Sequence, residues 1–98
     1  MILKKHNSPQ GIILALCDKN ILGKTFETED FQLDLSSDFY QGKEKTEKEI
    51  KIEIKKAYII NICGEQSINF AKKENLVTDS QIKIIKKIPY AQIIIIRD

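Results

Sequence analysis

Two cysteines, one histidine and one aspartate are the side chains of this sequence with the clearest potential for catalysis. Cys17 directly precedes Asp18, while Cys63 and the single histidine, His6, lie far from both in sequence. An adjacent carboxylate raises the pKa of a thiol, so Asp18 makes Cys17 a weaker nucleophile. The three potential metal ligands are not at the spacing of a zinc site. We therefore expect a protein that is not an enzyme and that holds no metal or cofactor.

Lysines and tyrosines indicate a second kind of chemistry, the binding of nucleic acid. The 16 basic residues exceed the 14 acidic ones by only two, and acidic residues interleave the lysines of residues 44–56, as on a mixed solvated surface. Two pairs of adjacent lysines could still contact phosphates, namely Lys72, Lys73, Lys86 and Lys87. Tyr40 and Tyr90 could stack on RNA bases. RNA or a ribonucleoprotein is therefore the first hypothesis for a partner.

A set of polar residues beside glycines offers an alternative, the recognition of a protein or a small ligand. The candidate recognition residues are Tyr40, Asn61, Glu65, Tyr90 and Gln92. The structural alternative is that Asn61 and Gln92 only satisfy backbone groups of loops, and that Gly64 provides a positive φ. Burial distinguishes the two hypotheses, because recognition needs these side chains to converge on an open cleft.

The first half of the chain is predicted to form strands. Residues 2–6 and 12–17 are strand candidates, joined by a turn that contains Pro9 and Gly11. Residues 31–35 alternate apolar with polar side chains, as a half-buried strand does. The residues after position 17 are expected to form a turn, and those after position 35 a loop.

The middle of the chain predicts two consecutive helices. The alternating isoleucines after Glu49 also fit a strand, but the capping box of Glu49 with Thr46 favours a helix that continues to Gly64. On this helix Asn61 would lie on the apolar face and would need a hydrogen-bond partner. Gly64 would end the helix in a left-handed conformation, and Glu65 would lie in the first turn of the second helix.

The C-terminal region is predicted to return to strands. Residues 78–81 fit a cap followed by a single turn, and residues 82–88 are a strand candidate. Residues 89–92 are predicted to form a turn, and residues 93–96 a strand that is buried on both faces. The whole chain, residues 1–98, is expected to be one α+β domain, in which a mixed or antiparallel sheet carries the two consecutive helices packed on one face.

The composition argues against a membrane protein. No apolar segment approaches the roughly 20 residues that cross a bilayer, and the N-terminus lacks the apolar core of a signal peptide. We expect a cytoplasmic protein, a monomer or a homodimer, whose two cysteines stay reduced.

Several short motifs, taken in order, resemble the DUF424 family of small archaeal proteins of unknown function. The motifs are Cys17-Asp18, Leu22-Gly23-Lys24-Thr25-Phe26, Phe39-Tyr40-Gln41-Gly42, Asn61-x-x-Gly64-Glu65, Leu76-Val77 and Ile88-Pro89-Tyr90-Ala91-Gln92. This resemblance covers nearly the whole chain and implies a compact α+β domain in an archaeal cytosol, with no established activity. The family tends to have a histidine where this chain has Tyr90, and a phenol, with a pKa of about 10, is a poor base near neutrality. The resemblance therefore favours a structural or recognition role for Tyr90.

Overall fold

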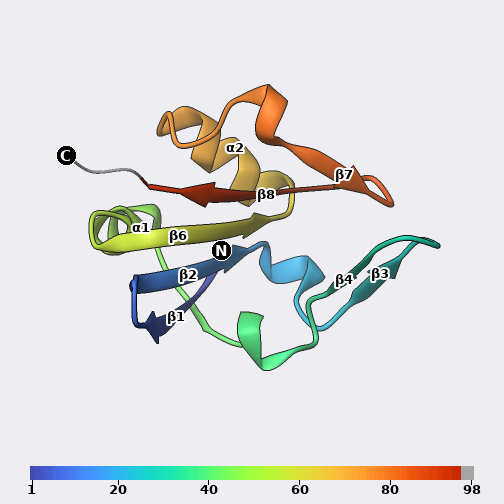
Figure 1. Ribbon diagram of the computed structural model, residues 1–98, viewed down its shortest axis with the longest axis horizontal. Coiled ribbons are helices and arrows are strands. Elements are labelled where there is room, and N and C mark those ends of the chain that lie inside the picture. The colour runs from blue at the N-terminus through green and yellow to red at the C-terminus, as the bar shows by residue number, and fades with distance from the viewer. Residues whose placement is uncertain (96–98) are drawn as a thin grey trace.

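The centre of the structure is a mixed six-stranded sheet. The computed structural model describes residues 1–95, and Figure 1 shows the long strands lying side by side. In spatial order the strands are β5 (Lys43–Glu44), β1 (Ile2–Ser8), β2 (Gly11–Cys17), β6 (Ala57–Cys63), β8 (Ile88–Ile94) and β7 (Lys83–Ile85). β2 and β6 are parallel, and every other neighbouring pair is antiparallel. The α+β class predicted from the sequence is confirmed.

Both helices cover the same face of this sheet, as predicted. α1 (Glu47–Ile54) and α2 (Glu65–Lys73) pack against alternate residues of β2 and β6. The buried residues that they share include Leu14, Leu16, Ile50, Ile60, Ile62, Ile68, Phe70 and Ala71. Each fully buried aliphatic side chain contributes roughly 1.5–3 kcal/mol, so this core is the main source of stability. Within residues 1–95, neither helix is long and apolar enough to cross a lipid bilayer.

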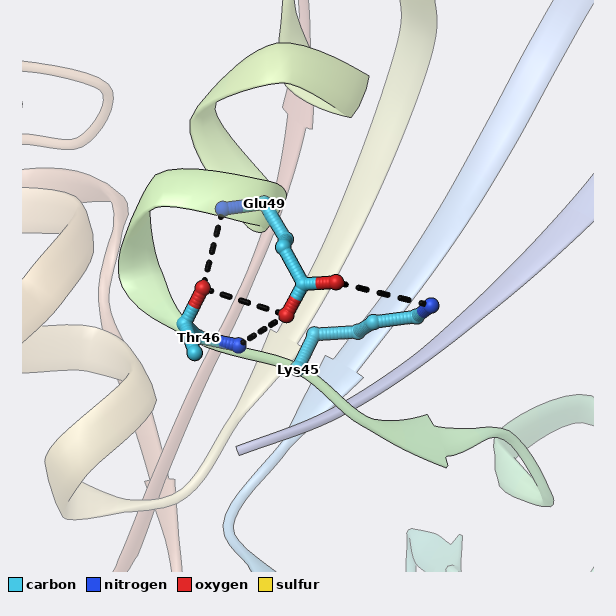
Figure 2. A network of polar contacts seen from close by, with 3 residues as sticks. All are labelled: Lys45, Thr46 and Glu49. Atoms are coloured by element: carbon cyan, nitrogen blue, oxygen red, sulfur yellow. Dashed lines mark hydrogen bonds and ion pairs between the residues drawn. The ribbon is translucent and has the colours of Figure 1, made fainter.

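α1 begins where the sequence predicts, because its first turn is capped from two directions. The Thr46 hydroxyl accepts a hydrogen bond from the Glu49 backbone N–H at 3.2 Å, and the Glu49 carboxylate accepts one from the Thr46 N–H at 3.0 Å (Figure 2). The Lys45 ammonium lies 3.9 Å from the other carboxylate oxygen of Glu49. The helix is amphipathic, and Ile52 on its outer side is half exposed.

The predicted continuation of this helix to Gly64 is wrong. α1 ends at Ile54, and the chain then forms β6. β6 pairs with β2 on one edge and with β8 on the other, so its β-branched side chains pack on a pleated surface and the tertiary pairing overrides the helical spacing. Asn61 therefore lies on a strand and not on the apolar face of a helix. Gly64 does not end a helix either, because it is the residue that precedes α2, with a φ of 108°.

A small hairpin covers part of the opposite face of the sheet. β3 (Thr25–Glu27) and β4 (Gln32–Asp34) form a separate two-stranded sheet that projects from the body of the molecule (Figure 1). A short 3-10 turn, Asp38–Tyr40, follows this hairpin and contacts β1 and β2. A second buried cluster joins these segments to the sheet and consists of Ile2, Cys17, Ile21, Leu33, Leu35, Cys63 and Ile85. β4 confirms the half-buried strand predicted at residues 31–35.

The predicted turn at residues 89–92 is wrong. These residues lie inside β8, and the chain reverses earlier, at residues 86–87 between β7 and β8. Pro89 is tolerated because it lies near the start of β8, one residue beyond the last β6–β8 pair, and is paired only with Ile84 of the edge strand β7. The Pro89 carbonyl accepts a hydrogen bond from the Gly64 N–H at 2.8 Å.

Burial on both faces, predicted for residues 93–96, holds for only part of that segment. Ile93 is 6% exposed and belongs to the core beneath the helices, whereas Ile94 is 56% exposed on the other face. Ile95 is half-buried, and Ile96 lies outside the described residues. The β3–β4 hairpin lies at the opposite end of β8 in Figure 1, which leaves this end of the strand with one open face.

The segment between α2 and β8 follows the prediction more closely. Thr78 caps a single 3-10 turn, Asp79–Gln81, and its backbone N–H donates a hydrogen bond to the Gln81 side chain at 2.9 Å. β7 occupies only residues 83–85 of the strand predicted at residues 82–88, because the chain reverses at Lys86 and Lys87.

Candidate recognition site

Asn61 and Gln92 lie side by side on the sheet face opposite the helices. Asn61 in β6 and Gln92 in β8 are direct partners in an antiparallel pair. Residues opposite each other in such a pair have Cβ atoms about 4.5–5.5 Å apart. Side chains alternate along a strand, so Tyr90 lies on the same face as Gln92. The register of the sheet therefore brings together three of the five predicted recognition residues.

These residues line a cleft of about 500 Å³ between the sheet and the β3–β4 hairpin. Tyr40, the fourth predicted recognition residue, also lines it. We call this cleft the carboxamide cleft, and define it by three carboxamides, three aromatic rings and one ammonium group: Asn61, Gln81, Gln92, Phe31, Tyr40, Tyr90 and Lys83.

Two aromatic rings connect the hairpin to the sheet across this cleft. The rings of Phe31 and Tyr90 are stacked, with centroids 5.3 Å apart and planes 11° from parallel. Such a pair contributes about 0.5–1.5 kcal/mol beyond the area that it buries. Phe31 is 43% exposed, so the aromatic wall of the cleft is accessible from solvent.

Most polar groups of the cleft are available to a ligand, whereas the Gln81 side chain accepts hydrogen bonds from Thr78. Within residues 1–95, no protein group forms a hydrogen bond with the side chains of Asn61 or Gln92 or with the hydroxyls of Tyr40 or Tyr90. The expected internal partner for Asn61 is therefore absent from this part of the chain, because its side chain lies on a partly open sheet face and not in a helix interface. Each carboxamide presents both a donor and an acceptor.

Two buried thiols of the second cluster and the Tyr40 phenol packed against that cluster are held in their neutral forms. Burial, followed by the charge of Asp18, raises the pKa of the Cys17 thiol to about 11. Burial, followed by the neighbouring Cys17, raises the pKa of Cys63 to about 12. Burial also raises the pKa of the Tyr40 phenol to about 12. Near neutral pH the two thiols are therefore poor nucleophiles, and Tyr40 is a hydrogen-bond donor and not a base.

No metal site is formed by the described part of the chain. Among residues 1–95, no three His, Cys, Asp or Glu side chains are placed to hold a metal ion. His6 lies elsewhere, stacked on Phe39 with ring centroids 4.6 Å apart, and its Nε2 atom is 3.0 Å from the Phe39 carbonyl.

Comparison with known proteins places the chain in a family. The sequence profile described as "Protein of unknown function (DUF424)" matches residues 6–96 of the 98-residue chain. The chain belongs to this family. The resemblance inferred from the short motifs is therefore confirmed, and no curated protein matches the chain.

A solved structure has the same fold as this DUF424 chain. It is the crystal structure of an uncharacterized conserved protein from Methanopyrus kandleri, with a TM-score of 0.81 and 25% sequence identity. The similarity covers 99% of this chain and 93% of the other. The two comparisons support the family and the fold, and neither assigns an activity.

Glu65, the fifth predicted recognition residue of this DUF424 domain, lies apart from the carboxamide cleft. It is the first residue of α2 and lines a separate hollow of about 250 Å³, together with Lys87 and Pro89. Pro89 and Gly64 are hydrogen-bonded, so the two predicted segments do meet. Glu65 is nevertheless separated from the cleft, because α2 covers the other face of the sheet.

The four predicted phosphate contacts divide into two unlike pairs. Lys72 pairs with Asp79 at 2.9 Å, and Lys73 pairs with Glu47. Lys86 and Lys87 form the β7–β8 turn, and neither makes an ion pair within residues 1–95. Lys87 lies near the first residue of α2 while the other pair lies at its end, about 13 Å away for a nine-residue helix. The structure does not bring the two pairs together.

Sequence reasoning missed three residues of the cleft and one important polar contact. Phe31, Gln81 and Lys83 enter the cleft only through the tertiary arrangement, and no local signal identifies them. The missed contact is Asp18, whose carboxylate accepts hydrogen bonds at the first turn of α2. One signal could have revealed it. Gly64 at the N-cap has no side chain, so the cap of α2 must come from elsewhere in the chain.

Proposed function

We propose that this protein is a non-enzymatic binding domain that takes an unstacked base of single-stranded RNA into the carboxamide cleft. The observation that supports this function is the convergence of the Asn61 and Gln92 carboxamides with the stacked rings of Phe31 and Tyr90. Sequence-specific RNA recognition generally uses these two kinds of contact, hydrogen bonds to base edges and stacking on aromatic faces.

The chemistry of the cleft suits a base better than it suits a reaction. A carboxamide donates and accepts at adjacent atoms, which matches the paired donors and acceptors on the edge of a base. The stacked pair of Phe31 and Tyr90 offers an aromatic surface, exposed at Phe31, on which any base can stack at about 1–3 kcal/mol per base. The two buried thiols, Cys17 and Cys63, are protonated at neutral pH, so they supply no nucleophile.

The experiment is a fluorescence-anisotropy titration at low salt with labelled six-nucleotide RNAs of adenylate, uridylate and cytidylate. Tyr90→Ala is expected to weaken binding about 5- to 150-fold, which corresponds to the loss of one stacked base. Asn61→Ala and Gln92→Ala are expected to reduce the preference among the three RNAs, because they remove contacts to the base edge.

The control variant is Gln10→Ala, which removes an exposed carboxamide in the turn between β1 and β2. It should bind RNA as the unmodified protein does. Thermal unfolding of each variant separates lost binding from lost folding. The proposal is wrong if micromolar protein retains none of the three RNAs at low salt, or if the cleft variants bind as well as Gln10→Ala.

A second candidate function is recognition of a basic segment of a protein partner. Residues 25–42 contain five acidic residues and no basic one, and this segment includes the hairpin wall of the cleft. None of these carboxylates forms an ion pair within residues 1–95. Hydrogen bonds from Ser36 and then Thr25 lower the pKa of Asp34, which keeps that carboxylate ionised. The acidic residues are Glu27, Glu29, Asp30, Asp34 and Asp38.

The two functions predict opposite effects on binding when charged side chains beside the cleft are neutralised. If a lysine-rich peptide is the ligand, Glu29→Gln with Asp30→Asn should weaken binding, and Lys83→Gln should leave it unchanged or strengthen it. If RNA is the ligand, Lys83→Gln should weaken binding, and Glu29→Gln with Asp30→Asn should leave it unchanged or strengthen it. The same anisotropy titration, with a labelled lysine-rich peptide beside the RNAs, measures both.

A further inference from the structure

The turn between β7 and β8 has an unusual sequence for its geometry. Ile85 and Ile88 are paired across a two-residue loop, and both loop residues, Lys86 and Lys87, have positive φ, of 49° and 70°. Positive φ at both central positions is the mark of a type I′ turn, which strongly favours Asn-Gly or Gly-Gly. A side chain with a Cβ is disfavoured in this region of φ. The two lysines are therefore held in a conformation that the backbone alone does not favour, and such positions are concentrated at functional sites.

A third lysine connects this turn to the carboxamide cleft. Lys83 lines the cleft, and it is the direct partner of Tyr90 in the β7–β8 pair. All three lysines are exposed, and none forms an ion pair within residues 1–95. Residues 80–95 contain no acidic residue, although Asp18 and Glu65 line the hollow beside Lys87. The β7–β8 hairpin is thus a cationic strip that begins in the cleft and ends at the turn.

The segment that supplies the opposite wall of the cleft carries the opposite charge. Residues 25–42, with five carboxylates and no cation, would repel a phosphate backbone. An RNA strand with one base in the cleft therefore has only one electrostatically favourable side for its backbone, the side of β7 and β8.

We propose that the β7–β8 hairpin is the phosphate-binding edge of the cleft, and that Lys83, Lys86 and Lys87 contact the backbone of the RNA strand whose base the cleft holds. This inference rests on the proposed function, and it adds the side of the cleft on which the backbone lies and the groups that bind its phosphates. Each lysine binds as a point charge, so the contacts carry no base preference.

The test compares two charge-matched double variants of the full chain. Lys86→Asn with Lys87→Gly installs the favoured type I′ sequence and removes two charges. Lys48→Gln with Lys56→Gln removes two exposed lysines in and just after α1. RNA affinity is measured by anisotropy at several salt concentrations with the six-nucleotide RNA that binds best.

Three phosphate contacts predict a slope of log K against log salt of about −2, which is roughly an 18-fold loss of affinity between 50 and 200 mM salt. The turn variant is expected to have a slope of about −0.7, a loss of only about threefold over the same range. Its thermal unfolding midpoint is expected to stay the same or rise, since the turn is relieved of strain. The α1 variant is expected to keep the slope of the unmodified protein.

The outcomes separate this inference from the proposed function. If the turn variant keeps the slope of about −2 while Tyr90→Ala still weakens binding, the phosphates are bound elsewhere and this inference is wrong although the cleft binds RNA. If the α1 variant lowers the slope as much as the turn variant does, the effect is one of net charge and the inference is also wrong. If the unmodified protein binds no RNA, the proposed function fails and this inference fails with it.

Discussion

Asp18 caps the first turn of α2 from the end of a different element, through Ser67. The buried Asp18 carboxylate accepts hydrogen bonds from the Ser67 N–H and hydroxyl, both at 2.8 Å, and from the Gln66 N–H at 2.9 Å. Asp18 and Ser67 are 49 positions apart in sequence. The parallel pairing of β2 with β6 brings the ends of both strands to one edge of the sheet, so Asp18 reaches the helix that follows β6.

Asp18→Ala is expected to lower the free energy of unfolding by roughly 2–4 kcal/mol, because it leaves buried donors at the N-terminus of α2 without an acceptor. Asp18→Asn keeps one acceptor oxygen and is expected to cost about half as much. Urea unfolding at neutral pH measures both. Asp30→Ala, which removes an exposed carboxylate, is the control and should change stability by less than about 0.5 kcal/mol. If Asp18→Ala lowers the free energy of unfolding by no more than the control Asp30→Ala does, Asp18 has no capping role.

Gly64 is required for two separate reasons, its φ and its closeness to Asp18. A Cβ at this position would lie 2.4 Å from Asp18 Cγ, and the φ of 108° is unfavourable for other residues. Gly23 separates the two effects, since its φ of 89° is also positive but a Cβ there would meet nothing within 4 Å. We expect Gly23→Ala to cost about 1–2 kcal/mol and Gly64→Ala at least about 3 kcal/mol.

Thermal or urea unfolding of the two alanine variants tests this difference. Equal losses would mean that only backbone conformation matters and that the contact with Asp18 relaxes without penalty. If the contact with Asp18 carries no penalty, the double variant Gly64→Ala, Asp18→Ala should lose the sum of the two single losses. We expect a smaller loss than this sum, because both substitutions disturb the same contact.

Stability should fall at high pH because of the buried thiols. Burial raises the pKa of Cys17 to about 11 and that of Cys63 to about 12, from an ordinary value near 9. Between pH 9 and about 11–12 the unfolded chain therefore binds fewer protons at these groups than the folded chain does, so the free energy of unfolding decreases as pH rises through this window.

The double variant Cys17→Ala, Cys63→Ala is expected to show a shallower decrease over the same window, whatever its stability at neutral pH. Urea unfolding between pH 8 and 11 gives the slopes. Lysines titrate in this range in both proteins, so the difference between the slopes, and not either slope alone, reports on the thiols. Identical slopes would show that the thiols do not titrate differently in the folded and unfolded chains.

Ile93 and Ile94 are adjacent in sequence but differ in environment. Ile93 packs in the core beneath the helices, and Ile94 lies on the open face. Ile93→Ala is expected to lower stability by roughly 2–5 kcal/mol, and Ile94→Ala by less than about 1 kcal/mol. Chemical unfolding of the two variants measures the difference, and each serves as the control for the other. Similar losses would mean that the open face of β8 is covered in solution.

The local signals in the sequence determined the elements that depend on local chemistry. The capping box of Thr46 with Glu49 fixes where α1 begins, the cap at Thr78 fixes the turn after α2, and residues 12–17 form a strand because a continuous apolar run of that length suits a pleated, buried surface. The family assignment also came from short motifs. These features follow from contacts between residues close in sequence, which composition and spacing record directly.

Tertiary structure alone decided which segments became β6 and β8, and which side chains meet in the cleft. The β-branched segment at residues 57–63 fits both a helix and a strand, and only its pairing with β2 and β8 makes it a strand, which moves Asn61 from a helix face to the floor of a cleft. The same pairing turned residues 89–92 from a turn into a strand and placed Tyr90 and Gln92 beside Asn61. Register between distant strands has no local signature, because a shift of one residue would leave every local pattern unchanged and yet reverse the face of each side chain.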